Sequence, residues 1–499
     1  MLSLFQTNSS YYVRWLFLKC MAAIYLIAFA SLSVQIMGLI GSQGILPAKD
    51  YLELVARNVD SSHFGSLPTV FWFNCSDQML QAICWAGIIC SLLAFFGLAQ
   101  GILFFLMWAM YLSLFHVGQD FLGFQWDILL LEVGFLCVFF APWRFWVKNI
   151  FEDPPSRIVL YLLWWVLFRL MFQSGLVKLL SGDESWTNLT ALNYHFMTQP
   201  IPNPVSWFMH WLPGWVLKCS TFIMFSIEFG CPVLILFGRW GRMAACLGIS
   251  GLMIIVILTG NYCFFNLLVL ALCLLLLNDA LVKKILSKKF LSRQEVSAPS
   301  ASLNRVIWWT KQGMIICVAL IIILISAINF NNRWAAPRSS PGPIALLMKY
   351  AGPFALTNSY GLFAVMTKTR PEIILEGSND GRVWQAYEFK WKIGDLKRRP
   401  PQVAAHQPRL DWQMWFAAMG SNYQHSPWTV SLMQKLLEGS KPVVDLLGTN
   451  PFPDQPPKLV RALIYEYKFT DAKTRRETGQ WWERKLLGLF CPPLYLNKK

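Results

Sequence analysis

The sequence predicts a polytopic α-helical membrane protein of about nine transmembrane helices, followed by a small β-rich C-terminal extracytoplasmic domain. Three observations predict this fold class. Of the 499 residues, 55% are hydrophobic and only 14% are charged, whereas a soluble domain carries about 25% charged residues. Long apolar stretches recur up to about residue 330, and basic clusters separate them. Beyond that point the chain is rich in proline and charge and carries strand signals.

Nine stretches are apolar and close to the roughly 20 residues that a membrane-spanning helix needs. They cover residues 15–37, 79–98, 101–116, 126–142, 158–180, 215–238, 241–259, 261–279 and 306–328. The second and third stretches meet around Gly97 to Gly101, so one bent helix is an alternative to two. The first stretch lacks a convincing cleavage site, which argues against a cleaved signal peptide. We therefore expect a transmembrane bundle over residues 1–329, with a long outer loop at 181–214, and a soluble domain over residues 330–499.

The basic residues give this bundle an orientation. If Arg14 and Lys19 lie in the cytoplasm, nine crossings place the other basic clusters between spans on the same side. These clusters are Arg144, Lys148 and Arg157; Arg239 and Arg242; and Lys283, Lys284, Lys288, Lys289, Arg293 and Arg305. The loop 181–214 on the opposite side has no lysine or arginine. Lys49 and Arg57, in the loop 39–78 on that same side, are exceptions. Because cytoplasmic loops of membrane proteins carry the excess of positive charge, we expect residues 330–499 to be extracytoplasmic.

The C-terminal part has local signals of both strands and helices. The runs Glu372–Glu376 and Trp384–Lys392 flank an Asp380-Gly381 dipeptide, which is typical of a β-hairpin. Leu459–Phe469 predicts a further strand. Two short helices are expected at Trp412–Met419 and Val430–Leu437.

Charged and polar side chains within predicted spans are candidates for function, because they are costly in lipid. The candidates are Glu132, Arg169, Gln173, Lys178 and Glu228. At 1.5 Å per residue, Glu132 lies about 9 Å and Arg169 about 12 Å from the outer face of a core of about 30 Å. These two are therefore expected to pair. Glu228 falls near the midplane, and Asp127 with Lys178 forms a second possible pair near the outer boundary.

Two interpretations of these charges remain open. Either Arg169 and Glu132 lock neighbouring helices while Lys178 reaches the interface, or the group lines a polar cavity for a ligand or for chemistry. Lys178 lies nine residues after Arg169 and would point the other way on a continuous helix. One catalytic cluster with both requires a break, for example at Gly175, so the structural interpretation is favoured.

Further candidates lie in the outer loop and the C-terminal part. They are Asp183, Trp186, His195 and Gln199 in the loop, and His406, Arg409, Asp411, Trp412 and Trp415 in the tail. His195 is either an acid/base residue or, more commonly, a hydrogen-bonded structural one. Arg409 and Asp411 are interpreted as an ion pair supporting a surface on which Met414, Trp415 and Phe416 meet the bilayer or a partner. Trp186, Trp207, Trp211 and Trp215 are expected to be interfacial anchors.

The sequence lacks the motifs of several common enzyme classes. There is no G-x-S-x-G nucleophile elbow, H-E-x-x-H zinc motif or phosphate-binding loop, so we assign no cofactor and no metal. Of the 12 cysteines, Cys75 and Cys491 leave room for at most one exposed disulfide. The net charge of +16 is not concentrated in a basic domain, which argues against nucleic-acid binding.

Motifs spread over most of the chain carry a family resemblance. They are FRLM at 168–171, SGD at 181–183, TQP at 198–200, TGNY at 259–262, NSYGLF at 358–363, RPP at 399–401 and HQPRLDWQMWF at 406–416. Between about residues 120 and 490 the chain resembles the lipase maturation factor family. The resemblance implies a chaperone-like folding factor that is resident in the endoplasmic reticulum membrane in animals and assists secretion of active lipases. It implies no catalytic residues, because the family has none that are agreed.

Three functions are therefore considered. The favoured one is a membrane-embedded maturation and folding factor whose partners are membrane lipids and secreted client proteins, lipases by resemblance. It would reside in the endoplasmic reticulum membrane of a eukaryote or the cytoplasmic (inner) membrane of a bacterium. The alternative is an integral-membrane enzyme acting on a lipid, a quinone or a client side chain. Transport is least favoured, because the sequence shows no internal repeat.

Overall fold

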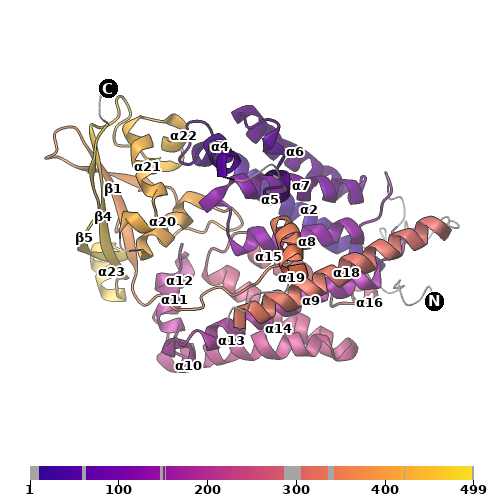
Figure 1. Cartoon of the computed structure of the whole chain (residues 1–499). Coiled ribbons are helices and arrows are strands. Elements are labelled where there is room, and N and C mark those ends of the chain that lie inside the picture. Colours follow the sequence, from indigo (N-terminus) through magenta and orange to yellow (C-terminus); the bar gives the residue numbers. More distant parts are fainter. Residues whose placement is uncertain are drawn as a thin grey trace.

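The computed structural model describes residues 10–58, 63–146, 150–151, 153–285, 305–334, 342–420 and 422–496. A helical bundle occupies one part of the molecule and an antiparallel sheet with its own helices lies at one end of it (Figure 1). The two parts are in direct contact. Lys148, Lys288, Lys289 and Arg293, which belong to the expected cytoplasmic clusters, lie outside the described residues.

Seven helices in the described ranges are long and apolar enough to cross a membrane. They are α2 (Tyr11–Ser33), α6 (Asp77–Phe96), α7 (Gln100–Val117), α9 (Arg157–Leu180), α13 (Gly214–Ile235), α14 (Gly238–Thr259) and α18 (Arg305–Trp334). All seven fall on predicted spans. Gly97 separates α6 from α7 with a φ of 92°, a conformation that glycine adopts at no steric cost. The chain therefore forms two helices here and not one bent helix.

The two other predicted spans form shorter helices. α8 (Gln125–Phe140) has 16 residues and ends just before Pro142, which cannot continue a helix. α15 (Phe265–Leu274) has 10 residues, or about 15 Å at 1.5 Å per residue, about half of the hydrocarbon core. Residues 260–264 do not join this helix because they leave the bundle axis to meet the C-terminal part. The expected count of about nine is thus approximate.

Apolar side chains on the outer helices have no protein to cover them. α14 has a mean hydropathy of 2.1 over its span, yet only 22% of that span is buried. Phe96, Ile223, Leu247 and Leu320 are each more than half exposed. A water-soluble protein rarely exposes so large an apolar surface. The chain is an integral membrane protein, and these side chains are the ones that face lipid.

The sheet has five antiparallel strands in the order β3-β2-β1-β4-β5. The strands are β1 (Pro371–Ser378), β2 (Gln385–Phe389), β3 (Leu447–Thr449), β4 (Leu459–Phe469) and β5 (Trp482–Leu494). The predicted hairpin is confirmed, because Leu375 of β1 pairs with Tyr387 of β2. The predicted strand 459–469 is confirmed as β4.

β5 was missed by the sequence analysis. Its sequence contains Gly488, Pro492 and Pro493, residues that argue against a central strand. β5 is an edge strand, where the absence of an outer partner makes proline tolerable. A short helix, α23 (Ala472–Thr478), joins it to β4.

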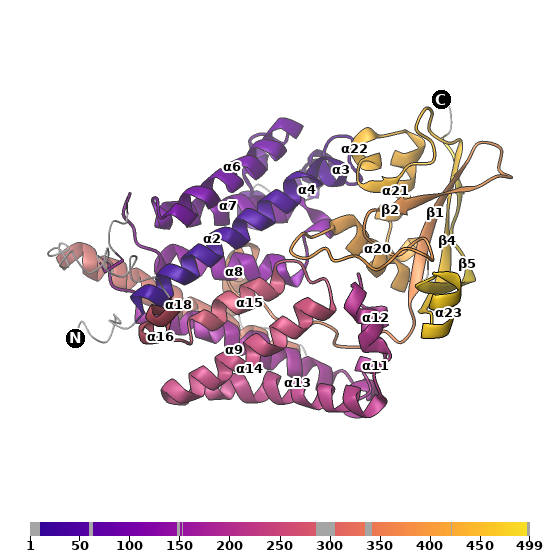
Figure 2. The ribbon, with the colours of Figure 1, turned by 180° about the vertical axis from the view of Figure 1, so that it is seen from behind.

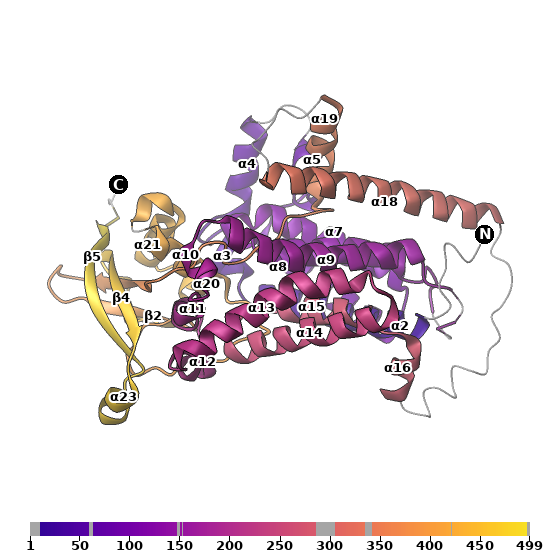
Figure 3. The same ribbon diagram turned by 90° about the horizontal axis from the view of Figure 1, so that it is seen from below.

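Two helices lie between the sheet and the bundle (Figures 1 and 2). They are α20 (Arg409–Met419) and α21 (Trp428–Leu437), and both were predicted. The outer loop between α9 and α13 is also folded, into α10 (Glu184–Thr187), α11 (Leu192–Thr198) and α12 (Pro204–His210). Figure 3 places α11 and α12 between the ends of the bundle helices and the sheet.

Shorter helices complete the described ranges. They are α3 (Ile36–Ile40), α4 (Ala48–Asn58), α5 (His63–Ser66), α16 (Asp279–Ile285), α19 (Gly342–Ala351) and α22 (Lys441–Val444), with single 3-10 turns at Val70–Trp72, Gln119–Phe121, Gly352–Phe354 and Tyr423–His425. The domain boundary expected between residues 329 and 330 falls within α18, which continues to Trp334. We keep that division as a prediction.

The contact of α3 with α22 leads to a first prediction about how closely the two parts pack. A Cβ atom on Gly38 would lie 2.3 Å from the carbonyl oxygen of Pro442 in α22. A backbone atom cannot move aside cheaply, so Gly38→Ala should lower the free energy of unfolding by about 1–3 kcal/mol. Gly251→Ala in α14 meets no atom within 4 Å and is the matched control. Thermal unfolding in detergent measures both, and equal melting temperatures would contradict this packing.

Candidate functional site

Arg409 carries a positive charge from the C-terminal part into the helical bundle. Its guanidinium lies 2.8 Å from an Asp127 carboxylate oxygen of α8 and donates to the carbonyl of Phe121 at 2.7 Å. The hydroxyl of Tyr111 in α7 donates to the same carboxylate at 2.5 Å. Asp127 is fully buried and Arg409 nearly so. The pair therefore fixes α20 against α7 and α8.

This arrangement corrects two predicted pairings. Asp127 was expected to pair with Lys178, and Arg409 with Asp411. The Asp411 carboxylate instead accepts the backbone N–H groups of Trp391 and Lys392, each at 2.8 Å. Arg409 and Asp411 are two positions apart on α20 and so face different directions. Each of the two residues connects α20 to a different neighbouring segment.

Glu132 and Arg169 form the second buried ion pair, and this predicted pair is confirmed. This pair also contacts residues that follow α18 in the sequence. The Tyr360 hydroxyl donates to Glu132 at 2.6 Å, and the Asn358 N–H donates to it at 3.0 Å. Arg169 donates to the carbonyl of Asn358 at 2.9 Å. Gln173 accepts the N–H of Tyr360 at 3.0 Å. The pair thus holds residues 358–360 against α8 and α9.

Lys178 and Glu228 form a third buried pair, with Nζ 2.5 Å from Oε1. Lys178 does not reach the membrane interface, because it is only 6% exposed. α9 is continuous through Gly175, so Arg169 and Lys178 belong to separate pairs on one helix. The single catalytic cluster considered from the sequence is therefore not formed.

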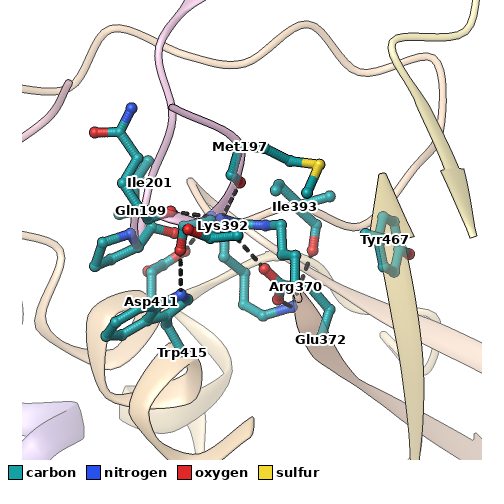
Figure 4. A network of polar contacts seen from close by, with 12 residues as sticks. Met197, Gln199, Ile201, Arg370, Glu372, Lys392, Ile393, Asp411, Trp415 and Tyr467 are labelled. Carbon is teal, nitrogen blue, oxygen red and sulfur yellow. Dashed lines mark hydrogen bonds and ion pairs between the residues drawn. The ribbon is translucent and has the colours of Figure 1, made fainter. Parts of the chain in front are cut away.

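Arg370 joins the outer loop to the sheet (Figure 4). Its guanidinium donates to the carbonyls of Met197 and Pro200, at 2.7 and 2.8 Å, and also to that of Gln199. Glu372 lies 2.8 Å from Arg370 and 3.0 Å from Lys392. All three charged side chains are at most 2% exposed. The carbonyls at the end of α11 are thereby tied to β1.

Polar side chains of the outer loop hold the loop in place. Asp183 caps α10 by accepting the N–H of Ser185 at 2.9 Å, and it accepts the N–H of Met366 at 2.6 Å. The Gln199 amide donates to the carbonyl of Thr259 at 2.9 Å and accepts the Tyr262 hydroxyl at 3.0 Å. The loop is therefore bonded both to the bundle and to the C-terminal part.

Two histidines lie in these contacts. A ring nitrogen of His195 is 3.2 Å from the Tyr262 hydroxyl, and one of His406 is 2.9 Å from the Ser31 hydroxyl. Burial and then the positive charge of Lys178 lower the pKa of His195 to about 4. Burial and then nearby cations lower the pKa of His406 to about 4 as well. Both rings are neutral at pH 7.

Aromatic side chains fill the junction. Trp412 packs edge-on against Trp126 at 4.7 Å between ring centres, and the Trp415 indole donates to the carbonyl of Thr198 at 2.9 Å. Met414 and Trp415 are buried, which corrects their expected place on an exposed surface, whereas Phe416 is 41% exposed.

The expected interfacial tryptophans divide into two groups. Trp186 and Trp207 are buried and donate to the carbonyls of Phe363 and Thr470. The prediction that they are interfacial anchors is therefore wrong. Trp211 and Trp215 are exposed, at 49% and 71%.

The arrangement is suited to holding two parts rigidly together. Its charged groups are engaged with one another or with backbone groups. Within the described ranges, no group of three or more His, Cys, Asp or Glu side chains could hold a metal ion. All 12 cysteines are described and unpaired, so Cys75 and Cys491 do not form a disulfide.

Sequence reasoning missed several residues of this junction. Glu372 and Lys392 lie in two runs that carried only strand signals, and Arg370, just before the first run, carried no signal. Tyr360 lies in the motif NSYGLF at 358–363, which supported the resemblance but was given no role. The sequence contained no signal that Asp127 would meet Arg409, 282 residues away.

Comparison with known proteins gives matches over most of the chain. Residues 12–284 match the family described as "Lipase maturation factor transmembrane domain", and residues 356–492 match "Lipase maturation factor C-terminal domain". Lipase maturation factor 2 of Homo sapiens is 36% identical, over 97% of this chain and 83% of the relative. The Xenopus tropicalis protein of that name is 34% identical, over 96% and 82%. Lipase maturation factor 1 of Bos taurus is 33% identical, over 96% and 88%.

No solved structure matches the chain. The comparisons and the geometry give no support to the alternative of an intramembrane enzyme. The charged residues on which that alternative rested are divided between the Glu132–Arg169 and Lys178–Glu228 pairs, and His195 contacts Tyr262 instead.

The Arg409–Asp127 pair leads to a prediction about stability. Arg409→Gln leaves the Asp127 carboxylate buried without its cation, and removing one member of a buried pair costs about 3–5 kcal/mol. Lys435→Gln is the control, because it breaks an exposed pair with Glu438 that contributes about 0–1 kcal/mol. Chemical unfolding in micelles measures both variants. Similar unfolding midpoints for the two variants would show that the buried pair does not hold the parts together.

The two histidines predict a dependence of stability on pH. Their pKa values are about 4 in the folded chain and about 6.5 in an unfolded one. Below pH 6.5 the unfolded state therefore binds more protons, and stability falls as the pH is lowered towards 4. At pH 5.5 the loss is about 1.4 kcal/mol for His195 and less for half-buried His406.

Melting temperatures between pH 7.5 and 5.5 test this dependence. The double variant His195→Gln/His406→Gln should lose less stability over that interval than the unmodified chain. His425→Gln replaces an exposed histidine and should follow the unmodified chain. An unchanged slope in the double variant would refute the assignment.

Proposed function

Since this chain belongs to the lipase maturation factor family, we propose that it is a membrane-embedded maturation factor that assists lipases in reaching their active form. The helical bundle anchors the chain, and the C-terminal part contacts the folding client. The relatives named lipase maturation factor 1 and 2 align with nearly the whole chain, which supports transfer of this role. In a eukaryote the site of action is the endoplasmic reticulum membrane, and in a bacterium it is the cytoplasmic membrane.

The proposed orientation places the sheet on the extracytoplasmic side. The first residues of α2 lie at the end of the bundle far from the sheet (Figure 2). The turn from α13 to α14 lies at the same end. That turn carries Arg239 and Arg242, and α16 nearby carries Lys283 and Lys284. Positive charge favours the cytoplasmic side. A secreted client would therefore meet the C-terminal part.

The exposed edge of the sheet is the main structural support for this function. β5 is an edge strand of 13 residues, and no other described strand pairs with its outer side. Leu486, Leu487 and Leu489 on this strand are 52–54% exposed. Long apolar edges attract other strands, and soluble proteins usually protect them. An incompletely folded lipase presents the extended apolar segments that such an edge binds.

We infer that clients add a strand to β5. In this mode backbone hydrogen bonds provide affinity with little dependence on sequence, while pockets between side chains provide modest selectivity. A maturation factor with several clients requires this combination. The buried charge pairs at the junction support the mode, because they hold the sheet at a fixed place above the bundle.

Substitutions on β5 test this function. Leu486→Glu/Leu489→Glu replaces exposed residues, so folding should persist, while apolar contact with a client is lost. We expect the secreted activity of a co-expressed lipase to fall at least about tenfold, which corresponds to about 1.4 kcal/mol of client binding. The level of the variant in the membrane is measured in the same cells.

Val383→Glu is the matched control, because Val383 is 63% exposed in the β1–β2 turn of the same domain. It should leave lipase activity within about twofold of the unmodified chain, a change of less than 0.5 kcal/mol. Undiminished lipase activity with the β5 variant at normal abundance would exclude β5 as the client surface.

A further inference from the structure

A cavity of about 550 Å³ lies among α9, α13, α14 and α15, next to the outer loop. These helices run side by side in the bundle (Figure 3). The walls are mostly apolar, with Leu170, Met224, Ile227, Met253 and Val256 among them. The volume is within the range of small-molecule sites in proteins, about 300–1,000 Å³. It is separate from the Arg409 and Arg370 contacts and from β5.

Polar atoms gather on one side of this cavity. The Lys178–Glu228 pair, Asn266 and the His195–Tyr262 contact all line it. Glu228 Oε2 and Asn266 Oδ1 are buried and accept no hydrogen bond from any described residue. Glu228 is 6% and Asn266 1% exposed. An unpaired buried acceptor costs about 1–3 kcal/mol, so both atoms favour a ligand that brings hydrogen-bond donors.

The charges in the cavity decide what kind of head group it accepts. Lys178 and Glu228 cancel one another, and the lowered pKa leaves His195 neutral at pH 7. Among the described residues that line the cavity, no cation is free to bind a phosphate or carboxylate head group, and the free oxygen of Glu228 would repel such a group. Hydroxyl groups are uncharged and can donate to both orphaned acceptors.

The mouth of the cavity faces the lipid. Ile223 of α13 and Ile255 and Leu258 of α14 line it, and each is 55–57% exposed. Both helices are candidate membrane spans. A ligand can therefore reach the polar side by moving laterally from the bilayer, with its apolar chain along the cavity walls.

We propose that this cavity binds an uncharged, hydroxyl-bearing membrane lipid of the acylglycerol class. The hydroxyl groups donate to Glu228 Oε2 and Asn266 Oδ1, and an acyl chain lies between α13 and α14. The site binds the lipid and performs no reaction on it. This inference does not depend on the client surface, since the cavity and β5 share no residue.

Photolabelling of the full-length chain in phosphatidylcholine vesicles tests the proposal. The probe is a monoacylglycerol with a diazirine in its acyl chain, because its two hydroxyl groups match the two unpaired acceptors, and labelled peptides are identified by mass spectrometry. We expect labelling within α13 and α14, with competition by unlabelled monoacylglycerol. A lysophosphatidylcholine probe with the same chain should label these peptides at least about fivefold less, a difference of about 1 kcal/mol.

Two variants locate the site. Ile255→Trp narrows the mouth at an exposed position and should reduce labelling at least about fivefold, or about 1 kcal/mol. Asn266→Leu removes one acceptor at similar volume and should reduce it by a factor of about 2–10, as expected for the loss of one hydrogen bond. Leu247→Trp, at an exposed position of α14 that does not line the cavity, is the control and should label normally.

The results have separate meanings for the two proposals. Equal labelling by both probes, or labelling that Ile255→Trp leaves unchanged, would overturn the lipid site even if Asn266→Leu failed to fold. The β5 variant should label like the unmodified chain. Loss of lipase maturation in that variant with normal labelling would support the client surface alone.

Discussion

The contact between Arg409 and Asp127 is the constraint on which the other contacts of this structure depend. A guanidinium from the C-terminal part enters the bundle and meets a carboxylate at full burial. Neither group is stable there alone, because an uncompensated buried charge costs several kcal/mol. The pair therefore forms only when the two parts of the chain are assembled in one register.

Two further sets of contacts repeat this principle at different places. Glu132 and Arg169 hold residues 358–360, and Arg370 holds the carbonyls at the end of α11. In each case a charged side chain of one part forms hydrogen bonds with groups of another part. Buried polar groups of this kind specify one arrangement only when all their partners are present. This explains why the outer loop is folded into three short helices and is not a flexible connection.

Local patterns in the sequence were sufficient for much of the fold. The seven long helices, the β1–β2 hairpin, β4, α20 and α21 all follow from hydropathy, turn residues or periodicity. β5 was missed because its proline residues are tolerated only at an edge, and edges are a property of the whole sheet. α15 was predicted too long because Asn261 and Tyr262 leave the apolar run to make distant contacts.

The site was only partly accessible from sequence, for a related reason. Depth along a helix predicted the Glu132–Arg169 pair, since both residues lie on neighbouring spans. Depth alone placed Lys178 beside Asp127. In the structure Asp127 pairs with Arg409 from the C-terminal part, and Lys178 pairs with Glu228. Contacts across hundreds of residues leave no local pattern, and a single sequence does not contain them.

Hydrogen–deuterium exchange of the full-length chain in lipid nanodiscs tests most directly whether the buried charges join the two parts into one unit. The backbone amides of α20, of residues 196–201 and of residues 358–360 are the ones to follow. All three should exchange as slowly as the central strands β1 and β4, because they open only when the junction opens. Rapid exchange of residues 196–201 and 358–360 beside a protected sheet would contradict it.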